Sequence, residues 1–101
     1  MSDLYFNTAI LLNGNSAPFT GTWVPMGRGR DNLFTLYTNH SGQISLQYKS
    51  PFFDEGVEFY NVTISGSGYA SPTYSTSPMS EVRAVCSGGT GKFWAAITTQ
   101  S

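Results

Sequence analysis

The sequence predicts an all-β protein: a single antiparallel β-sandwich, jelly-roll or immunoglobulin-like, that spans residues 1–101. Apolar residues recur at every second position, which is the period of a strand with one buried face. Turn-forming residues interrupt this pattern at intervals of roughly 8–14 residues, the spacing of a sandwich with about 7–8 short strands. Charged residues make up only 11% of the chain, so no substantial helix with a Lys- and Glu-rich surface is expected.

The first four expected strands follow this alternation from the N-terminus. The face of residues 4–12 that is expected to turn inward carries Leu4, Phe6, Ile10 and Leu12. Residues 21–26 are expected to form a short edge strand, because Pro25 cannot donate a hydrogen bond to a central ladder. Residues 43–49 alternate apolar and polar side chains and are predicted to be a half-buried strand, and residues 32–38 are also predicted to be a strand.

The second half holds three more expected strands and one irregular stretch. Residues 57–64 form the first of these strands, and residues 65–80 hold either one short edge strand around 69–75 or an excursion with a contact role. The inward face of residues 81–87 carries Val82, Ala84 and Cys86. In residues 92–99, Phe93, Ala95 and Ile97 share one face and alternate with Trp94, Ala96 and Thr98 on the other.

Charge and composition argue against several classes of partner. The net charge of −1 provides no basic excess for a phosphate backbone, so nucleic acid is not an expected partner. The N-terminal segment begins with acidic Asp3 and its apolar run is interrupted, so no signal peptide is expected. No apolar run reaches the length of about 18 residues that a membrane-spanning helix needs. We therefore expect a soluble protein that is made in the cytoplasm and makes no membrane contact.

The stretch CSGGTGK, residues 86–92, has the composition of a phosphate-binding loop but not its pattern. The first glycine of that motif would stand where Cys86 is, and the residue after Lys92 is Phe93 instead of Ser or Thr. The residues that follow favour a strand, whereas a phosphate loop opens a helix. The stretch is therefore predicted to be a glycine turn that joins the last two strands as a hairpin.

Candidate catalytic and metal-binding residues are few. His40 lies in a turn and is expected to be solvated. Asp54, Glu55 and Glu58 could form a carboxylate pair for sugar hydrolysis or a weak calcium site, but an exposed hairpin tip is the preferred interpretation. Cys86 is expected to be a small, inert core residue. No enzymatic activity, cofactor or metal is expected.

Two segments are candidates for contacts with other proteins. The loop containing Arg28 and Arg30 could be a contact point, because arginine is enriched in interface hot spots. Phe52 and Phe53 lie at an expected hairpin tip, where two phenylalanines expose apolar surface unless a partner covers them. In addition, Trp23, Trp94 and several tyrosines could stack on sugars if the fold gathers them on one face.

Two stretches of the sequence resemble small structural proteins of bacteriophages. ISLQYKSPFFDEGVEFYNV, residues 44–62, resembles a hairpin of these proteins, and SEVRAVCSGGTGKFWAAI, residues 80–97, resembles their C-terminal hairpin. Residues 16–23 and 27–37 match more loosely. This resemblance implies a compact β-sandwich encoded among head and tail genes, with a non-enzymatic role in the virion. The sequence departs from the pattern at Phe52, Phe53 and the 65–80 stretch.

The resemblance leads to two expected functions. The first is a head decoration or cement protein, made in the host cytoplasm, that forms a homo-oligomer, for instance a trimer, and binds the major capsid protein or another virion protein. The alternative is a carbohydrate-binding β-sandwich module of a tail fibre or other receptor-binding protein.

Overall fold

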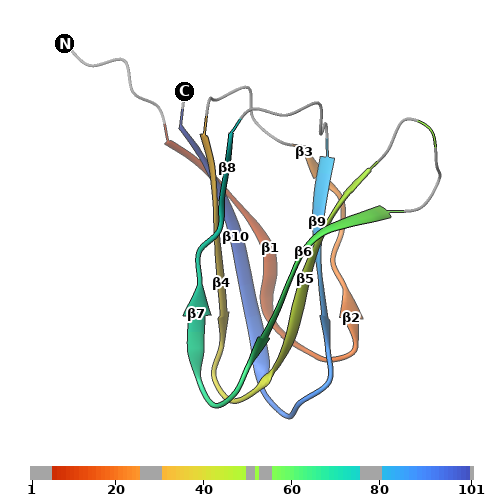
Figure 1. Cartoon of the computed structure of the whole chain (residues 1–101), viewed down its shortest axis with the longest axis vertical. Coiled ribbons are helices and arrows are strands. Elements are labelled where there is room, and N and C mark those ends of the chain that lie inside the picture. The colour runs from red at the N-terminus through yellow and green to blue at the C-terminus, as the bar shows by residue number, and fades with distance from the viewer. Residues whose placement is uncertain (1–5, 26–30, 50–51, 53–55, 76–80, 101) are drawn as a thin grey trace.

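The computed structural model describes residues 6–25, 31–49, 52, 56–75 and 81–100, and in this part of the chain it is all-β. Ten strands form two antiparallel sheets that pack face to face (Figure 1). The strands are β1 (Phe6–Ser16), β2 (Phe19–Thr20), β3 (Val24–Pro25), β4 (Asp31–Thr38), β5 (Gly42–Lys49), β6 (Gly56–Ile64), β7 (Gly68–Ala70), β8 (Thr73–Ser75), β9 (Glu81–Ser87) and β10 (Lys92–Gln100). This confirms the predicted sandwich, with more strands than the 7–8 expected.

The connectivity is that of a jelly roll. Sheet A has the order β1-β10-β4-β7 with β8 also paired to β4, and sheet B has the order β2-β9-β5-β6 with β3 also paired to β9. Each strand therefore pairs with its counterpart counted from the other end of the chain: β1 with β10, β2 and β3 with β9, β4 with β7 and β8, and β5 with β6. A long hairpin rolled into two sheets gives this pairing.

The core between the sheets is built by the alternation seen in the sequence. Val82, Ala84 and Cys86 on β9 are fully buried, as are Ile44 and Leu46 on β5. From sheet A, the core receives Leu11, Leu12, Phe34, Leu36, Phe93, Ala95 and Ile97. Because successive side chains on a strand point to opposite faces, this inward set fixes which side chains of β4, β9 and β10 face outward.

The prediction for the first strand was wrong at Ile10. The pairing of β1 with β10 shifts register between Ile10 and Leu12, so one extra residue, Leu11, enters the strand as a β-bulge. Leu11 and Leu12 are both buried, whereas Ile10 lies on the outer face with 58% of its side chain exposed. Strict alternation does not survive a bulge, which is why Ile10 and Leu12 do not share a face. The side chains of Leu4 and Phe6 lie outside the described part.

Residues 68–75 form two short strands, β7 and β8, where the sequence predicted either one edge strand around 69–75 or an excursion. Both β7 and β8 pair with β4, and Pro72 lies between them. Proline has no N–H to donate, so the ladder is interrupted there. The Pro72 carbonyl still accepts a hydrogen bond from the N–H of Phe34 at 2.9 Å, which keeps the interrupted strand along the edge of β4.

The CSGGTGK stretch joins two strands, as predicted, but not as a hairpin. Strand β9 belongs to sheet B and β10 to sheet A, so residues 88–91 cross from one sheet to the other. Residues 39–41 make the same crossing between β4 and β5 at the same end of the sandwich (Figure 1). By contrast, the hairpin predicted over residues 44–62 is present, since β5 pairs directly with β6.

Candidate functional site

The outer face of sheet B is a network of polar side chains that bond to one another. The Gln43 amide donates to Asn61 Oδ1 at 2.6 Å, and the Asn61 amide donates to Ser45 Oγ at 3.2 Å. On the neighbouring strand pair, Arg83 Nε donates to Gln47 Oε1 at 2.8 Å. Side chains whose hydrogen-bonding groups are already paired across the strands form an ordinary solvated sheet face.

Trp23 belongs to this polar face. The Arg83 guanidinium lies 4.3 Å from the centroid of the Trp23 ring, a cation–π contact. Arg83 points outward because its neighbours Val82 and Ala84 are buried. Trp23 is thus half-buried beneath Arg83 on sheet B, and it does not join Trp94, which lies on the opposite face of the sandwich. The two tryptophans that could have formed one sugar-binding surface are separated.

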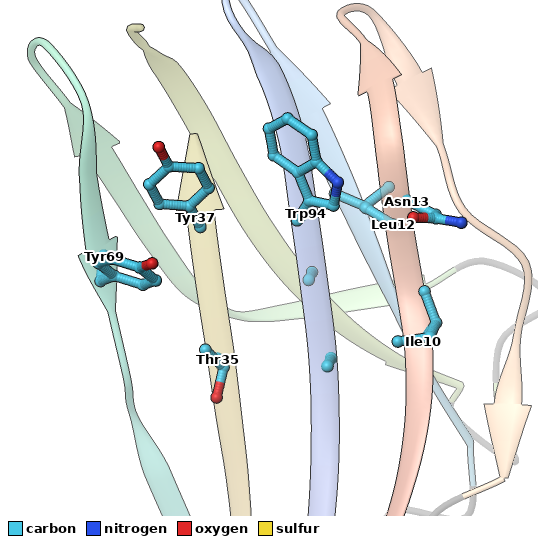
Figure 2. Close-up of a pocket in the computed structure, with 9 residues that line it drawn as sticks. Ile10, Leu12, Asn13, Thr35, Tyr37, Tyr69 and Trp94 are labelled. Atoms are coloured by element: carbon cyan, nitrogen blue, oxygen red, sulfur yellow. The ribbon is translucent and has the colours of Figure 1, made fainter. Parts of the chain in front are cut away.

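The outer face of sheet A carries a row of three aromatic side chains, Tyr69, Tyr37 and Trp94, hereafter the aromatic row (Figure 2). They come from the neighbouring strands β7, β4 and β10, in which Trp94 is directly paired with Tyr37 and Tyr37 with Tyr69. The ring centroids are 5.5 Å apart for Tyr37 and Trp94, and 4.6 Å apart for Tyr37 and Tyr69. Tyr69, at the sheet edge, is 73% exposed.

A second bulge in β1 provides the seat for the Trp94 indole. The register of β1 against β10 shifts again between Asn13 and Asn15, and the Asn15 side chain accepts a hydrogen bond from the Asn13 N–H at 2.9 Å. Between them, Gly14 has a φ of 74°, a conformation that costs glycine little. A Cβ atom at Gly14 would lie 3.5 Å from the indole, so the ring covers this glycine closely.

Beside the aromatic row lies a shallow hollow of about 240 Å³. Its floor includes the small side chains of Ala96 and Thr35, and Ile10 and Asn13 of β1 lie at its side (Figure 2). No side chain that lines it is ionisable at neutral pH. A hollow with aromatic walls, a small floor and a few polar groups is the usual composition of a small-molecule binding site.

Of the contact residues predicted from the sequence, only Phe52 belongs to the described part of the chain. Phe52 is 86% exposed, at the β5–β6 tip, which agrees with its predicted position. Arg28, Arg30 and Phe53 lie outside the described residues.

The strands that lead into the two predicted contact loops end beside one residue of β9, Glu81. Pro25 at the end of β3 is paired with Glu81. Lys49 at the end of β5 forms an ion pair with the same carboxylate at 3.7 Å. The ends of β3 and β5 therefore lie near each other at one end of the sandwich, opposite the crossings of residues 39–41 and 88–91 (Figure 1).

His40 and Glu58 are engaged in hydrogen bonds. His40 Nδ1 lies 2.8 Å from the Thr90 hydroxyl and 3.3 Å from the Ser41 hydroxyl, and the side chain is exposed in its turn, as predicted. Glu58 accepts a hydrogen bond from the Asn61 amide at 3.2 Å, while Asp54 and Glu55 lie outside the described part. Among the described residues there is no group of three side chains that could hold a metal ion.

Cys86 is fully buried, as the alternation predicted. Burial raises the pKa of the thiol, and hydrogen bonding with the backbone of Phe19 and of Cys86 itself partly opposes this. A buried thiol with a raised pKa has little reactive thiolate at neutral pH.

The aromatic row was not identified as a site from the sequence, although its signal was present. Tyr37 and Trp94 both alternate with buried residues, so both had to face outward. What the sequence did not provide was the strand pairing that sets them side by side, nor the β7 strand that adds Tyr69.

Comparison with known proteins identifies the fold. The chain matches no protein-family model and no curated protein. The structure is similar to the crystal structure of the SPBc2 prophage-derived protein YomS, with a TM-score of 0.78 and 10% sequence identity over 100% of this chain and 97% of that chain. At this identity the similarity concerns the fold alone: a prophage-derived protein has the same sandwich. In the described part of the chain, no helix is long and apolar enough to cross a membrane.

Proposed function

We propose that this protein is a non-enzymatic structural protein of a bacteriophage virion, and specifically a decoration or cement protein of the capsid. The observation that carries the proposal is the similarity in fold, over the whole length of both chains, to a protein described as prophage-derived. The resemblance of residues 44–62 and 80–97 to phage structural proteins supports the same role. The jelly roll is also an architecture that viral capsid domains use repeatedly.

The end of the sandwich near Glu81 is the proposed attachment surface. Phe52 exposes 86% of its side chain there, and an exposed phenylalanine gains apolar burial when a partner covers it. Pro25 and Lys49, which precede the sequence segments that hold Arg28, Arg30 and Phe53, both adjoin Glu81: Pro25 pairs with it along the backbone and Lys49 contacts its carboxylate. This end would bind the major capsid protein or another virion protein, and it would hold the copies of a homo-oligomer together.

The test is stoichiometric binding to virus particles. Purified protein is mixed with capsids from a phage that encodes it, after deletion of its gene, and bound protein is measured by sedimentation and mass spectrometry. We expect saturable binding to the capsid and, by electron cryomicroscopy, density for the sandwich at fixed positions on the head. Density on the tail would reject the decoration role while keeping a virion role. Absence from purified wild-type particles would reject both.

A further inference from the structure

The aromatic row is surrounded by hydrogen-bonding groups that the protein itself does not use. These groups are the Asn13 amide, the Thr35, Tyr37 and Tyr69 hydroxyls and the Trp94 indole N–H. Across the part of the chain that the structure covers, none of them makes a side-chain hydrogen bond, and only the backbone N–H of Asn13 is engaged. On sheet B, by contrast, the outward polar side chains hydrogen-bond in pairs, Gln43 with Asn61 and Arg83 with Gln47.

The ligand that fits this face is neutral and has both apolar and polar sides. The hollow is lined by no Asp, Glu, Lys, Arg or His, so it offers nothing to a phosphate, carboxylate or ammonium group. The faces of aromatic rings carry negative charge in their π-systems and attract the weakly positive hydrogens of C–H groups. A sugar ring presents C–H groups on one side and several hydroxyls around its edge.

We propose that this hollow on the outer face of sheet A binds a neutral, hydroxyl-rich sugar ring of a glycan. Trp94 and Tyr37 provide the stacking surface, since their rings lie side by side on the outer face with centroids 5.5 Å apart (Figure 2). Tyr69 closes one side of it from β7. Asn13, with one amide donor group and one carbonyl acceptor, and Thr35 bind the hydroxyls at the ring edge.

Two other occupants fit the same surface less well. A proline-rich peptide could stack on the aromatic row, but it has carbonyl acceptors and few donors, which would leave the Asn13 carbonyl unused. A second copy of this chain would bring an identical hollow against this one. The unpaired groups of Asn13, Thr35 and the tyrosines would then be buried without matched partners, which is unfavourable.

The inference depends on the proposed function only for its biological setting, in which the Glu81 end attaches to the virion and the aromatic row faces a host glycan. It is therefore tested on the purified protein alone. The probes are a panel of neutral hexose and N-acetylhexosamine oligosaccharides, with sialylated and phosphorylated glycans as charged comparisons. Binding of the parent and of every variant is followed by titration calorimetry, which needs no tryptophan, and Trp94 fluorescence in a Trp23→Phe background reports on the site itself. A ligand that fills the hollow with a single ring is expected to bind with a dissociation constant on the order of 1 mM.

The two tryptophans provide a matched control, because they lie on opposite faces. Trp94→Ala should weaken glycan binding by about 10-fold or more, and Asn13→Ala or Thr35→Ala by about 3- to 10-fold each. Trp23→Ala should leave the affinity within about 2-fold once circular dichroism shows that it is folded.

Four results would overturn the proposal. They are failure of the folded protein to bind any neutral glycan, binding that survives Trp94→Ala, preferential binding of a proline-rich peptide, and self-association that Trp94→Ala abolishes. Capsid binding of the unmutated protein is measured separately, so a negative glycan result rejects this site without rejecting the virion role.

Discussion

At the scale of single residues, the outer face of sheet A depends on Gly14. Its φ of 74° lies in the left-handed region, which side-chain-bearing residues adopt at a cost of roughly 1–2 kcal/mol. Gly14→Ala should therefore lower the free energy of unfolding by about that amount in urea denaturation. The Trp94 emission should change little, because the new methyl group would lie at an ordinary contact distance of 3.5 Å from the indole.

Gly66 provides the control for Gly14. Its φ is 72°, and a Cβ atom there would meet nothing within 4 Å. Gly66→Ala should thus cost the same backbone energy, and any difference between the two variants measures the contact with Trp94. If Gly14→Ala were as stable as the parent, the bulge that seats the indole would not have the conformation described above.

The buried thiol of Cys86 predicts both protection and a dependence on pH. The folded protein should resist a thiol reagent at neutral pH, and the denatured protein should react. Because burial raises the pKa of Cys86 in the folded state, the unfolded chain loses its thiol proton first as pH rises past about 8.5. The contribution of Cys86 to the free energy of unfolding is therefore fully present below that pH. It is lost as the pH rises from the unfolded pKa towards the higher pKa of the folded state.

Denaturation at several pH values checks this sign. The free energy of unfolding should fall between pH 8 and pH 10 more steeply in the parent than in Cys86→Ala, which has no thiol to titrate. Equal slopes, or rapid labelling of the native protein, would contradict the inward position of Cys86.

At the scale of elements, the two crossings between sheets support each other. The Lys92 N–H donates to Asn39 Oδ1 at 2.8 Å, and the Thr38 hydroxyl donates to the Lys92 carbonyl at 3.0 Å. Asn39→Ala removes the acceptor that holds the two crossings together and should destabilise the protein by about 0.5–2 kcal/mol. Thr22→Ala, at an exposed residue between β2 and β3 and outside both crossings, should stay within about 0.5 kcal/mol. Thermal or urea denaturation of both variants decides the matter, and equal losses would count against this role for Asn39.

The same crossings show how far the sequence predicts the fold. Alternation is a local property, so it correctly located β4, β5, β6, β9 and β10, together with the buried faces of β5 and β9. Which strands pair is not local, and residues 88–91 have the glycines of a hairpin turn whether or not the flanking strands share a sheet. The bulges at Leu11 and Gly14 likewise leave no clear trace in an alternating pattern. The aromatic row escaped prediction for this reason, since it requires the pairing of three strands.

At the scale of the whole molecule, the sandwich separates two proposed surfaces. The Glu81 end holds the ends of β3 and β5 and, on the β5–β6 tip, the exposed Phe52, whereas the aromatic row lies on the broad outer face of sheet A. Between them, the closely packed core keeps their relative position fixed. Changes at one surface should therefore leave the other unaffected, because distant sites without shared contacts behave additively.

This separation predicts opposite effects for two variants. Phe52→Ser should weaken capsid binding and oligomer formation by about 10-fold or more, as for an aromatic residue at an interface hot spot, and should leave glycan affinity unchanged. Trp94→Ala should weaken glycan affinity by about 10-fold or more and leave capsid binding and oligomer size unchanged. Both variants are first checked for folding by circular dichroism, then compared by sedimentation with capsids, light scattering and glycan titration.

If Phe52→Ser assembles like the parent, attachment does not use the β5–β6 tip. If Trp94→Ala loses capsid binding instead, the aromatic row is itself the attachment surface, because a neutral aromatic face that is covered in the virion cannot also face a host glycan.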